Sequence, residues 1–295
     1  MPEPIEITFL GTGAAVPTIR RNHSAIVLHY TGEYILFDCG EGTQLQLQKA
    51  KISPLKISKI FITHWHADHF AGLLPLIETL HLEKRTEPLE IYGPEASRFV
   101  DAIIELSYWG TGFDIIAKDV ESNQKIFEND LFEISTIKTR HSVPSVGYCF
   151  KEKDHVHIDI GKANKFGLRG IDIRKIKEDG KIKIGDKIIK LEDVSKITPG
   201  RKIIYTGDTR ICPEIFKAAK NIDLLIHEGT FIERFEEREH SSAKEVARLA
   251  KKNNVKKLIL THFSKRYKTS KEIEKVVKLI FSKAIVAQDL MKVKI

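Results

Sequence analysis

The chain reads Thr63-His64-Trp65-His66-Ala67-Asp68-His69 between a strand-like apolar run at residues 57–62 and a helix-like run at residues 70–82. Positions two apart on a strand point the same way, so His64 and His66 can aim at one point. Asp68 and His69 then lie on the turn into the helix and can aim at a second point nearby. Imidazole and carboxylate ligands together suit zinc, and suit manganese or iron less decisively. This segment therefore predicts a metal site.

Further ligand-type side chains stand at the ends of later apolar runs. These residues are His141, Asp208, His227 and His262. A ligand at a strand end is held by a rigid backbone, yet it opens into a loop that substrate can enter. One such histidine is more often structural than a ligand, but the repetition after the first cluster favours ligands.

Four shorter motifs accompany these ligands. They are Phe-Leu-Gly-Thr-Gly at 9–13 followed by Pro17, Arg21 and Asn22, then His-Glu-Gly-Thr at 227–230, His-Ser-Ser at 240–242, and Ala-Gln-Asp-Leu at 287–290. The ligand set resembles the metallo-β-lactamase superfamily, and the shorter motifs resemble its tRNase Z branch, endonucleases that trim the 3′ end of precursor tRNA. The resemblance covers nearly the whole chain. Its departures are modest: Ile19, Gly229 and Ser242 replace a lysine, an alanine and a threonine of the family pattern.

The resemblance implies a fold and a metal centre. The expected fold is an α/β, four-layer αβ/βα sandwich of the metallo-β-lactamase type. Two divalent ions per subunit are expected, zinc first, with manganese left open. One ion would take His64, His66 and His141, and the other Asp68, His69 and His262, with Asp208 bridging both. The family also implies a homodimer that acts on precursor tRNA.

The expected chemistry is hydrolysis of one phosphodiester. Two divalent ions can activate a hydroxide that attacks phosphorus, and Asp68 can accept its proton. The ribose 2′-hydroxyl is then not needed, so the products should be a 3′-hydroxyl on the tRNA and a 5′-phosphate on the trailer. His240 is the candidate general acid for the leaving oxygen, with Glu228 as its partner. His227 is a secondary candidate that could equally be structural.

Two basic loops are candidates for substrate binding. Arg21 and Asn22 follow the Gly-x-Gly turn, and in the resembled family this loop lies near the cleavage site. Lys265 and Arg266 stand between two aromatic residues just after His262. Stacking together with phosphate neutralisation would suit a single-stranded RNA end. A capped, solvated loop is an equally good interpretation of this second segment.

Composition sets limits on the protein class. The 295 residues carry a net charge of +8 and 42% hydrophobic residues, which is typical of a globular protein with a basic surface. Basic charge favours polyanionic partners, although by itself it is weak evidence. Three scattered cysteines indicate a reducing compartment, and we expect a cytoplasmic protein. No apolar run has the length of a membrane span, and no signal peptide is expected.

Strand-like and helix-like runs alternate along the chain and predict mixed α/β structure. We expect one metallo-β-lactamase-type domain over residues 1–295, with an insertion at residues 155–198. Between residues 155 and 200 the chain has 11 Lys or Arg against 7 Asp or Glu, together with several glycines. From composition alone this segment is as well explained by a charged surface hairpin. The family resemblance favours an arm that binds tRNA, although the family's Gly-Pro tip is missing.

Two other functions stay open at this point. Another hydrolase on the same scaffold could act on a thioester, a sulfate ester or a cyclic phosphodiester, because one fold supports many reactions. A metal-stabilised RNA-binding protein without catalysis would predict degraded ligands, whereas this chain keeps the full ligand set. Glu228, His240 and the basic insertion favour the tRNA-processing nuclease.

Overall fold

The computed structural model describes residues 3–108, 110, 112–185, 187–233 and 239–295. Two compact units divide the chain. The larger contains residues 1–128, 134–150 and 202–295, and the smaller contains residues 129–133 and 151–201. Among the described residues, no helix combines the length and the apolar character that crossing a bilayer requires.

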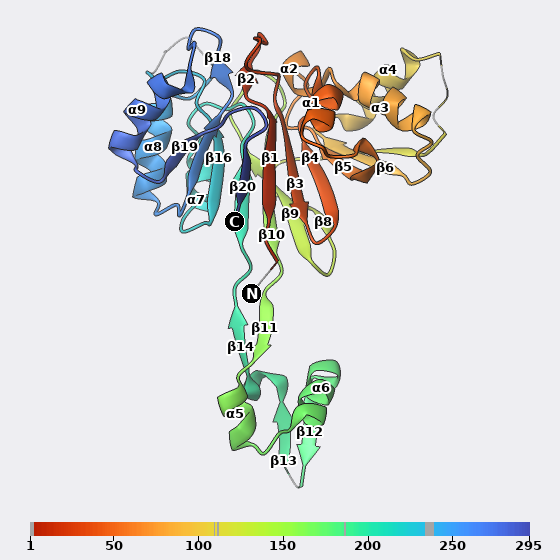
Figure 1. Cartoon of the computed structure of the whole chain (residues 1–295), viewed down its shortest axis with the longest axis vertical. Helices are drawn as coiled ribbons and strands as arrows, with labels where there is room; N and C mark the ends of the chain where they lie inside the picture. Colours follow the sequence, from red (N-terminus) through yellow and green to blue (C-terminus); the bar gives the residue numbers. More distant parts are fainter. Residues whose placement is uncertain (1–2, 109, 111, 186, 234–238) are drawn as a thin grey trace. The chain divides into compact units, whose positions relative to one another are not determined.

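Two seven-stranded sheets form the larger unit (Figure 1). In spatial order, the first consists of β20 (Lys292–Lys294), β1 (Glu6–Gly11), β3 (Ala25–Tyr30), β4 (Glu33–Phe37), β5 (Ile57–Phe61), β6 (Leu89–Gly93) and β7 (Ile115–Asp119). The second consists of β19 (Ala284–Val286), β17 (Leu258–Thr261), β16 (Leu224–Glu228), β15 (Lys202–Tyr205), β10 (Val146–Glu152), β9 (Phe132–Lys138) and β8 (Lys125–Glu128).

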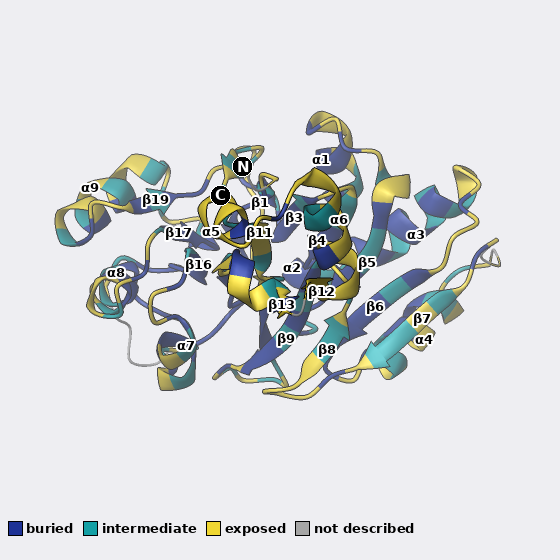
Figure 2. Ribbon diagram, turned by 90° about the horizontal axis from the view of Figure 1, so that it is seen from below, coloured by how far each residue is buried: buried dark blue, intermediate teal, exposed yellow. Residues whose placement is uncertain are grey.

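Aromatic side chains join the two sheets. The ring of Tyr148, from β10, meets that of Phe61, from β5, with 5.3 Å between the centroids. The Tyr148 hydroxyl also donates to the carbonyl of Ile62 at 2.6 Å. Central strands such as β1 and β3 are apolar on both faces because one face meets the opposite sheet and the other meets helices. Figure 2 shows that buried residues concentrate in strands such as β6 and β9, while exposed residues lie mainly on helices, loops and the edge strand β8.

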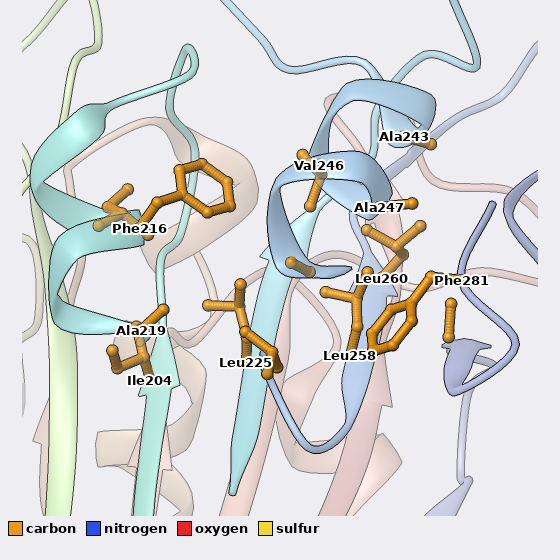
Figure 3. Packing of buried hydrophobic residues seen from close by; sticks show 14 of the residues in the cluster. Ile204, Phe216, Ala219, Leu225, Ala243, Val246, Ala247, Leu258, Leu260 and Phe281 are labelled. Carbon is orange, nitrogen blue, oxygen red and sulfur yellow. The ribbon is translucent and has the colours of Figure 1, made fainter. Parts of the chain in front are cut away.

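Helices cover the outer face of each sheet and complete four layers. Those of the first sheet are α1 (Thr43–Lys49), α2 (Ala67–Phe70), α3 (Leu73–Leu82) and α4 (Ala96–Glu105). Those of the second are α7 (Pro213–Ala218), α8 (Ala243–Lys252) and α9 (Ser270–Ile280). Figure 3 shows Val246 and Ala247 of α8 against Leu258 and Leu260 of β17. The prediction of an α/β sandwich is confirmed at this level.

The helix expected at residues 70–82 is interrupted. The structure has α2 before residue 71 and α3 from residue 73, because Gly72 packs directly on the loop after β4. A Cβ atom at Gly72 would lie 2.1 Å from the carbonyl oxygen of Gly40. The Gly72 N–H also donates to the carbonyl of Cys39 at 2.9 Å. This contact anchors the turn that carries Asp68 and His69.

The smaller unit contains the predicted insertion at residues 155–198. Its elements are β11 (His155–Ile158), α5 (Ile160–Lys165), α6 (Gly170–Asp179), β12 (Lys181–Ile184), β13 (Lys187–Lys190), the 3-10 turn η2 (Leu191–Val194) and β14 (Ser195–Thr198). A small core holds them together and includes Ala163, Leu168, Ile176 and Val194. At its base, Arg201 donates to the buried carboxylate of Glu152 through Nη2 and Nε, at 2.6 Å and 2.8 Å. The sequence did not predict the two helices.

The N-terminal loop at residues 12–22 is closed by a residue near the other end of the chain. One carboxylate oxygen of Asp289 accepts from the Thr12 hydroxyl at 2.7 Å. The other accepts from the Asn22 backbone N–H, also at 2.7 Å. Within the loop, β2 (Gly13–Ala14) pairs in parallel with β18 (Phe263–Ser264). The loop is thus held between two segments of the C-terminal half.

Candidate metal centre

Three imidazole nitrogens converge beyond the end of β5. His64 Nε2 and His66 Nδ1 lie 3.1 Å apart, and His141 Nε2 lies 3.1 Å from the same His66 atom. Two nitrogens on one tetrahedral zinc ion, each bound at about 2.0–2.1 Å, would lie about 3.3 Å apart. The three rings therefore already have the spacing of a shared ion.

A second group lies beside the first. His69 Nε2 and His262 Nε2 are 3.3 Å apart, and Asp68 Oδ2 lies 3.3 Å from the same His262 atom. Asp208 joins the two groups, because its Oδ1 lies 3.4 Å from His69 Nε2 and its Oδ2 lies 3.9 Å from His64 Nε2. Both donor sets, histidine with carboxylate, fit a divalent ion.

Backbone geometry brings these ligands together. Asp208 follows Gly207, whose φ is +57°, and a Cβ at Gly207 would lie 2.6 Å from the Cβ of Thr63. Only glycine allows the end of β15 to approach the end of β5 this closely. His262 has a φ of +58°, an uncommon value for a non-glycine residue, directly after β17. Strain of this kind is typical of functional positions.

Asp38 orients one candidate ligand of each group through hydrogen bonds, His69 directly and His64 through Thr63. Its carboxylate is fully buried and accepts from His69 Nδ1 at 2.7 Å and from the Tyr205 hydroxyl at 2.6 Å. It also accepts from the hydroxyl of Thr63 at 3.0 Å, and that hydroxyl lies 3.1 Å from His64 Nδ1. Since the hydroxyl has one proton and gives it to Asp38, it accepts from His64 Nδ1. Both rings then present Nε2 to the centre.

Glu228 supports the opposite side of the centre. Its Oε1 lies 3.1 Å from His240 Nδ1, and its Oε2 accepts from the Thr230 hydroxyl at 2.6 Å. The same hydroxyl lies 2.9 Å from His262 Nδ1. One buried carboxylate therefore orients His240 directly and His262 through Thr230, repeating the pattern of Asp38, Thr63 and His64.

The local charges set the protonation states. Burial alone would lower the pKa of His240, but the hydrogen bond and charge of Glu228 outweigh it and raise that pKa to about 9. Burial lowers the pKa of His64 well below its usual value, which keeps its ring neutral. Burial favours the neutral form of Asp208, yet His262 and His69 hold its pKa well below the usual range. Burial alone would lower the pKa of His69, but the charges of Asp208 and Asp38 outweigh it and raise that pKa well above its usual value. The centre thus places the cationic His69 and His240 beside the neutral His64 and the anionic Asp208.

A cavity of about 520 Å³ opens onto this centre. Its lining includes His66, His141, Asp208, His240 and His262. At its rim, the N–H of Ala15 donates to Asp68 Oδ2 at 2.8 Å, so the N-terminal loop contacts a ligand of the centre directly. Five of the seven predicted ligands and the predicted acid therefore face one space, while His64 and His69 lie buried behind it.

His227 does not line this cavity. Its ring is fully buried and stacks on Phe216, with 5.7 Å between the centroids. Nδ1 lies 2.9 Å from the carbonyl of Glu228, while Nε2 has no hydrogen-bond partner. These contacts favour the structural alternative for His227.

The predicted substrate residues differ in their surroundings. Arg21 is buried, with 8% of its surface exposed, and Asn22 binds the carbonyl of Glu41 through Nδ2 at 2.7 Å. Lys265 and Arg266 are exposed, and the Arg266 guanidinium lies over the ring of Phe231 at 4.8 Å. The Asn22 side chain therefore helps to close the loop, whereas the two later cations face solvent.

Asp38 and Thr230 were missed as site residues by sequence reasoning. Asp38 had a weak signal, because it is a carboxylate at the end of an apolar strand-like run, as Asp208 is. Thr230 lies in a quoted motif, but nothing local indicates that its hydroxyl joins Glu228 to a ligand 32 residues further along the chain.

Comparison with solved structures identifies the class of protein. Human tRNase Z, short form, matches with a TM-score of 0.71 and 31% identity over 98% of both chains. The metallo-β-lactamase fold protein YhfI of Bacillus subtilis also matches with a TM-score of 0.71, at 20% identity. The chain thus has the metallo-β-lactamase fold.

Sequence relatives identify the family. Ribonuclease Z of Methanosarcina acetivorans is 40% identical over 99% of this chain and 98% of its own length. Ribonuclease Z of Methanothermobacter thermautotrophicus is 40% identical over 99% and 97%. Residues 5–285 also match the family model described as Anti-Pycsar protein Apyc1. The chain belongs to the ribonuclease Z family as well as to the family of that model, and the predicted tRNase Z membership is confirmed.

Proposed function

We propose that this ribonuclease Z family member removes the 3′ trailer from precursor tRNA by hydrolysing one phosphodiester. The products would be a tRNA with a 3′-hydroxyl and a trailer with a 5′-phosphate. The arrangement of Glu228 and His240 beside the two ligand groups carries this proposal, because it supplies a proton donor next to a metal centre. Whole-chain identity of about 40% to ribonuclease Z proteins supports the choice of RNA over a small ester.

Two divalent ions, most simply zinc, would be held by the two groups. His64, His66 and His141 would bind one, and Asp68, His69 and His262 the other, with Asp208 shared. The fit rests on the converging nitrogens and on the neutral His64 ring described above. Such ions, when bound, would supply an activated water and offset charge on the phosphate.

Side chains of the protein would accept and donate the protons of the reaction. Asp68 lies at the cavity, where it can accept the proton of the attacking water. His240 offers Nδ1 to Glu228 and so leaves Nε2 for the departing 3′ oxygen. A pKa of about 9 keeps His240 protonated at neutral pH, as a general acid requires. Glu228 fixes the orientation of the ring and stabilises its charge.

The segment at residues 155–198 would bind the tRNA away from the cleavage site. Exposed apolar residues support this role, among them Ile171 at 85% and Ile188 at 64% exposure, alongside lysines such as Lys183 and Lys187. An apolar and cationic surface suits bases and phosphates. We further propose a cytoplasmic homodimer, as the family resemblance implies.

Cleavage of a precursor tRNA with a short trailer, with both product ends mapped, tests the proposal. We expect a single cut after the discriminator nucleotide that is lost in His66→Ala. Deletion of residues 162–190 should weaken RNA cleavage and spare hydrolysis of bis(p-nitrophenyl) phosphate. Hydrolysis of the small ester without RNA cleavage would overturn the tRNA assignment and leave the hydrolase.

A further inference from the structure

Arg21 is a buried cation with an unused hydrogen-bond donor. Its side chain is 8% exposed, and its Nη1 has no hydrogen-bond partner. The guanidinium lies over the ring of Phe263, with 4.6 Å between Cζ and the centroid. Burial lowers the pKa of Arg21 and the charge of Asp289 partly offsets this effect, but within the described ranges no ion pair joins the two side chains. Because Nη1 has no partner, Arg21 keeps a hydrogen-bond donor for a further anion.

Arg21 lines a cavity of about 280 Å³ that is separate from the one over the metal centre. Its lining adds the cations Arg20, Lys268 and Lys271. These three side chains are exposed at the mouth of the cavity, whereas Arg21 is buried. Four cationic residues therefore surround a space large enough for a phosphate group.

The start of α9 forms another wall of this cavity, through Thr269 and Ser270. The helix has 11 residues, and Thr269 at its N-cap makes no side-chain capping hydrogen bond. The first backbone N–H groups of a helix lack partners within it and favour an anion. The start of α9 and Arg21 therefore both favour an anion in this cavity.

The nearby carboxylates are already engaged. Glu274 lines the cavity, but it accepts an ion pair from Lys278 at 2.5 Å. Asp289 holds Thr12 and the Asn22 backbone through its two oxygens, as described for the N-terminal loop. The cavity thus keeps an excess of positive charge.

Two segments connect this cavity to the metal centre. Thr12 lines the basic cavity and Ala15 lines the metal cavity, with the short strand β2 between them. On the paired segment, β18 separates His262 from Lys268. The basic cavity and the metal cavity are therefore lined by neighbouring parts of the same two chain segments.

We propose that the cavity lined by Arg20, Arg21, Lys268 and Lys271 binds one backbone phosphate of the RNA, at a linkage other than the one that is cut. The inference rests on the proposed function, since it requires RNA at the metal centre. A phosphate held at a second point would fix the register of the strand over the catalytic groups.

A methylphosphonate scan tests this site. A neutral methylphosphonate is moved one linkage at a time through the end of the tRNA and the start of the trailer. We expect wild-type kcat/KM to fall about tenfold at one linkage that is not cut. Lys271→Ala should lose about tenfold on unmodified RNA and be insensitive to the methylphosphonate at that linkage. Its hydrolysis of bis(p-nitrophenyl) phosphate should match wild type.

Lys275→Ala is the matched control, because Lys275 is exposed on the same helix and does not line the cavity. It should behave as wild type throughout. If wild type and Lys271→Ala both cleave RNA and respond in the same way to the methylphosphonate at every linkage, the phosphate site is overturned and the proposed function stands. Failure of wild type to cleave RNA would overturn the proposed function, and the site with it. Inorganic phosphate could raise the melting temperature of wild type but not of Lys271→Ala, while no methylphosphonate lowers RNA cleavage. That result would indicate a site for free anions and would overturn the binding of RNA there.

Discussion

Two threonines work in the same way on opposite sides of the metal centre. Thr63 and Thr230 each give their hydroxyl proton to a buried carboxylate and accept from the Nδ1 of a candidate ligand. Such outer contacts fix the orientation of an imidazole and raise its affinity for metal. At the scale of single residues, the site therefore depends on hydroxyl groups as well as on its ligands.

Thr230→Val should weaken metal binding about 10- to 100-fold, because it leaves His262 Nδ1 without its partner. Valine keeps the shape of the side chain and lacks the hydroxyl. Competition against a chromophoric chelator measures the affinity. Thr230→Ser, which restores a hydroxyl, should recover most of the affinity. Equal affinities for the valine and serine variants would contradict the role of the hydroxyl.

Glu228→Gln should move the alkaline limit of activity to lower pH. Burial lowers the pKa of His240, but the hydrogen bond and charge of Glu228, with the charges of Asp208 and Asp68, raise it from 6.5 to about 9, so the acid is available below about pH 9 and lost above it. Without that charge, the limit should shift down by about two pH units. The pH profile of kcat reports it, and an unchanged limit would exclude His240 as the acid.

The same pKa shift has a consequence for stability. Because the folded-state pKa of His240 is raised, its contribution to stability is complete below pH 6.5 and is lost as the pH rises through about 9. Glu228→Gln removes that contribution, so its melting temperature should fall most relative to wild type at acidic to neutral pH. The difference should narrow towards pH 10.

At the scale of elements, the candidate metal ligands lie just after the ends of strands. The ligands follow β5, β9, β15 and β17, and each strand holds its ligand at the same edge of the sandwich. The sequence indicated these candidate positions because an apolar run followed by a ligand-type side chain is a local pattern. It could not predict Asp38, whose partners His69 and Tyr205 lie 31 and 167 residues away.

The helices of residues 155–198 were missed for a different reason. Helix α6 buries only Ile176 among its ten residues, so its sequence has little amphipathic periodicity. The helix expected at 70–82 failed at Gly72, because a close approach between distant segments overrides local propensity. Local patterns therefore indicated the candidate ligands and predicted the α/β fold, and non-local contacts decided the remainder.

Gly207→Ala should separate the ends of β5 and β15. A Cβ there would overlap Thr63 and also occupy a left-handed backbone conformation, so we expect a loss of about 2–3 kcal/mol and weaker metal binding through Asp208. Gly32→Ala is the control, because its φ is +87° and nothing lies within 4 Å of the added Cβ. It should cost about 1 kcal/mol and leave metal affinity unchanged. Similar losses in both variants would exclude the proposed overlap.

At the scale of the whole molecule, the metal centre joins the two halves of the sandwich. Asp68 and His69 come from the first sheet, and Asp208 and His262 come from the second. Ions bound only in the folded state stabilise it by mass action. Metal and fold are therefore coupled through the centre.

Chelation should lower the melting temperature by about 10 °C or more, and added zinc should restore it. Differential scanning calorimetry with and without a chelator measures the effect. In His66→Ala the chelator should have a smaller effect, since one ligand group is already incomplete. A melting temperature that ignores chelation would indicate that the centre holds no stabilising ion.

Asp289 also orders events in time. The ribosome releases Thr12 first and its carboxylate partner 277 residues later. Until then the N-terminal loop, which contacts Asp68 and borders the basic cavity, lacks its hydrogen bonds to Asp289. A nascent chain can thus pair β3, β4, β5 and β6 and still have no organised opening for RNA. Competence as a nuclease would therefore require translation of Asp289 as well as of the candidate ligands.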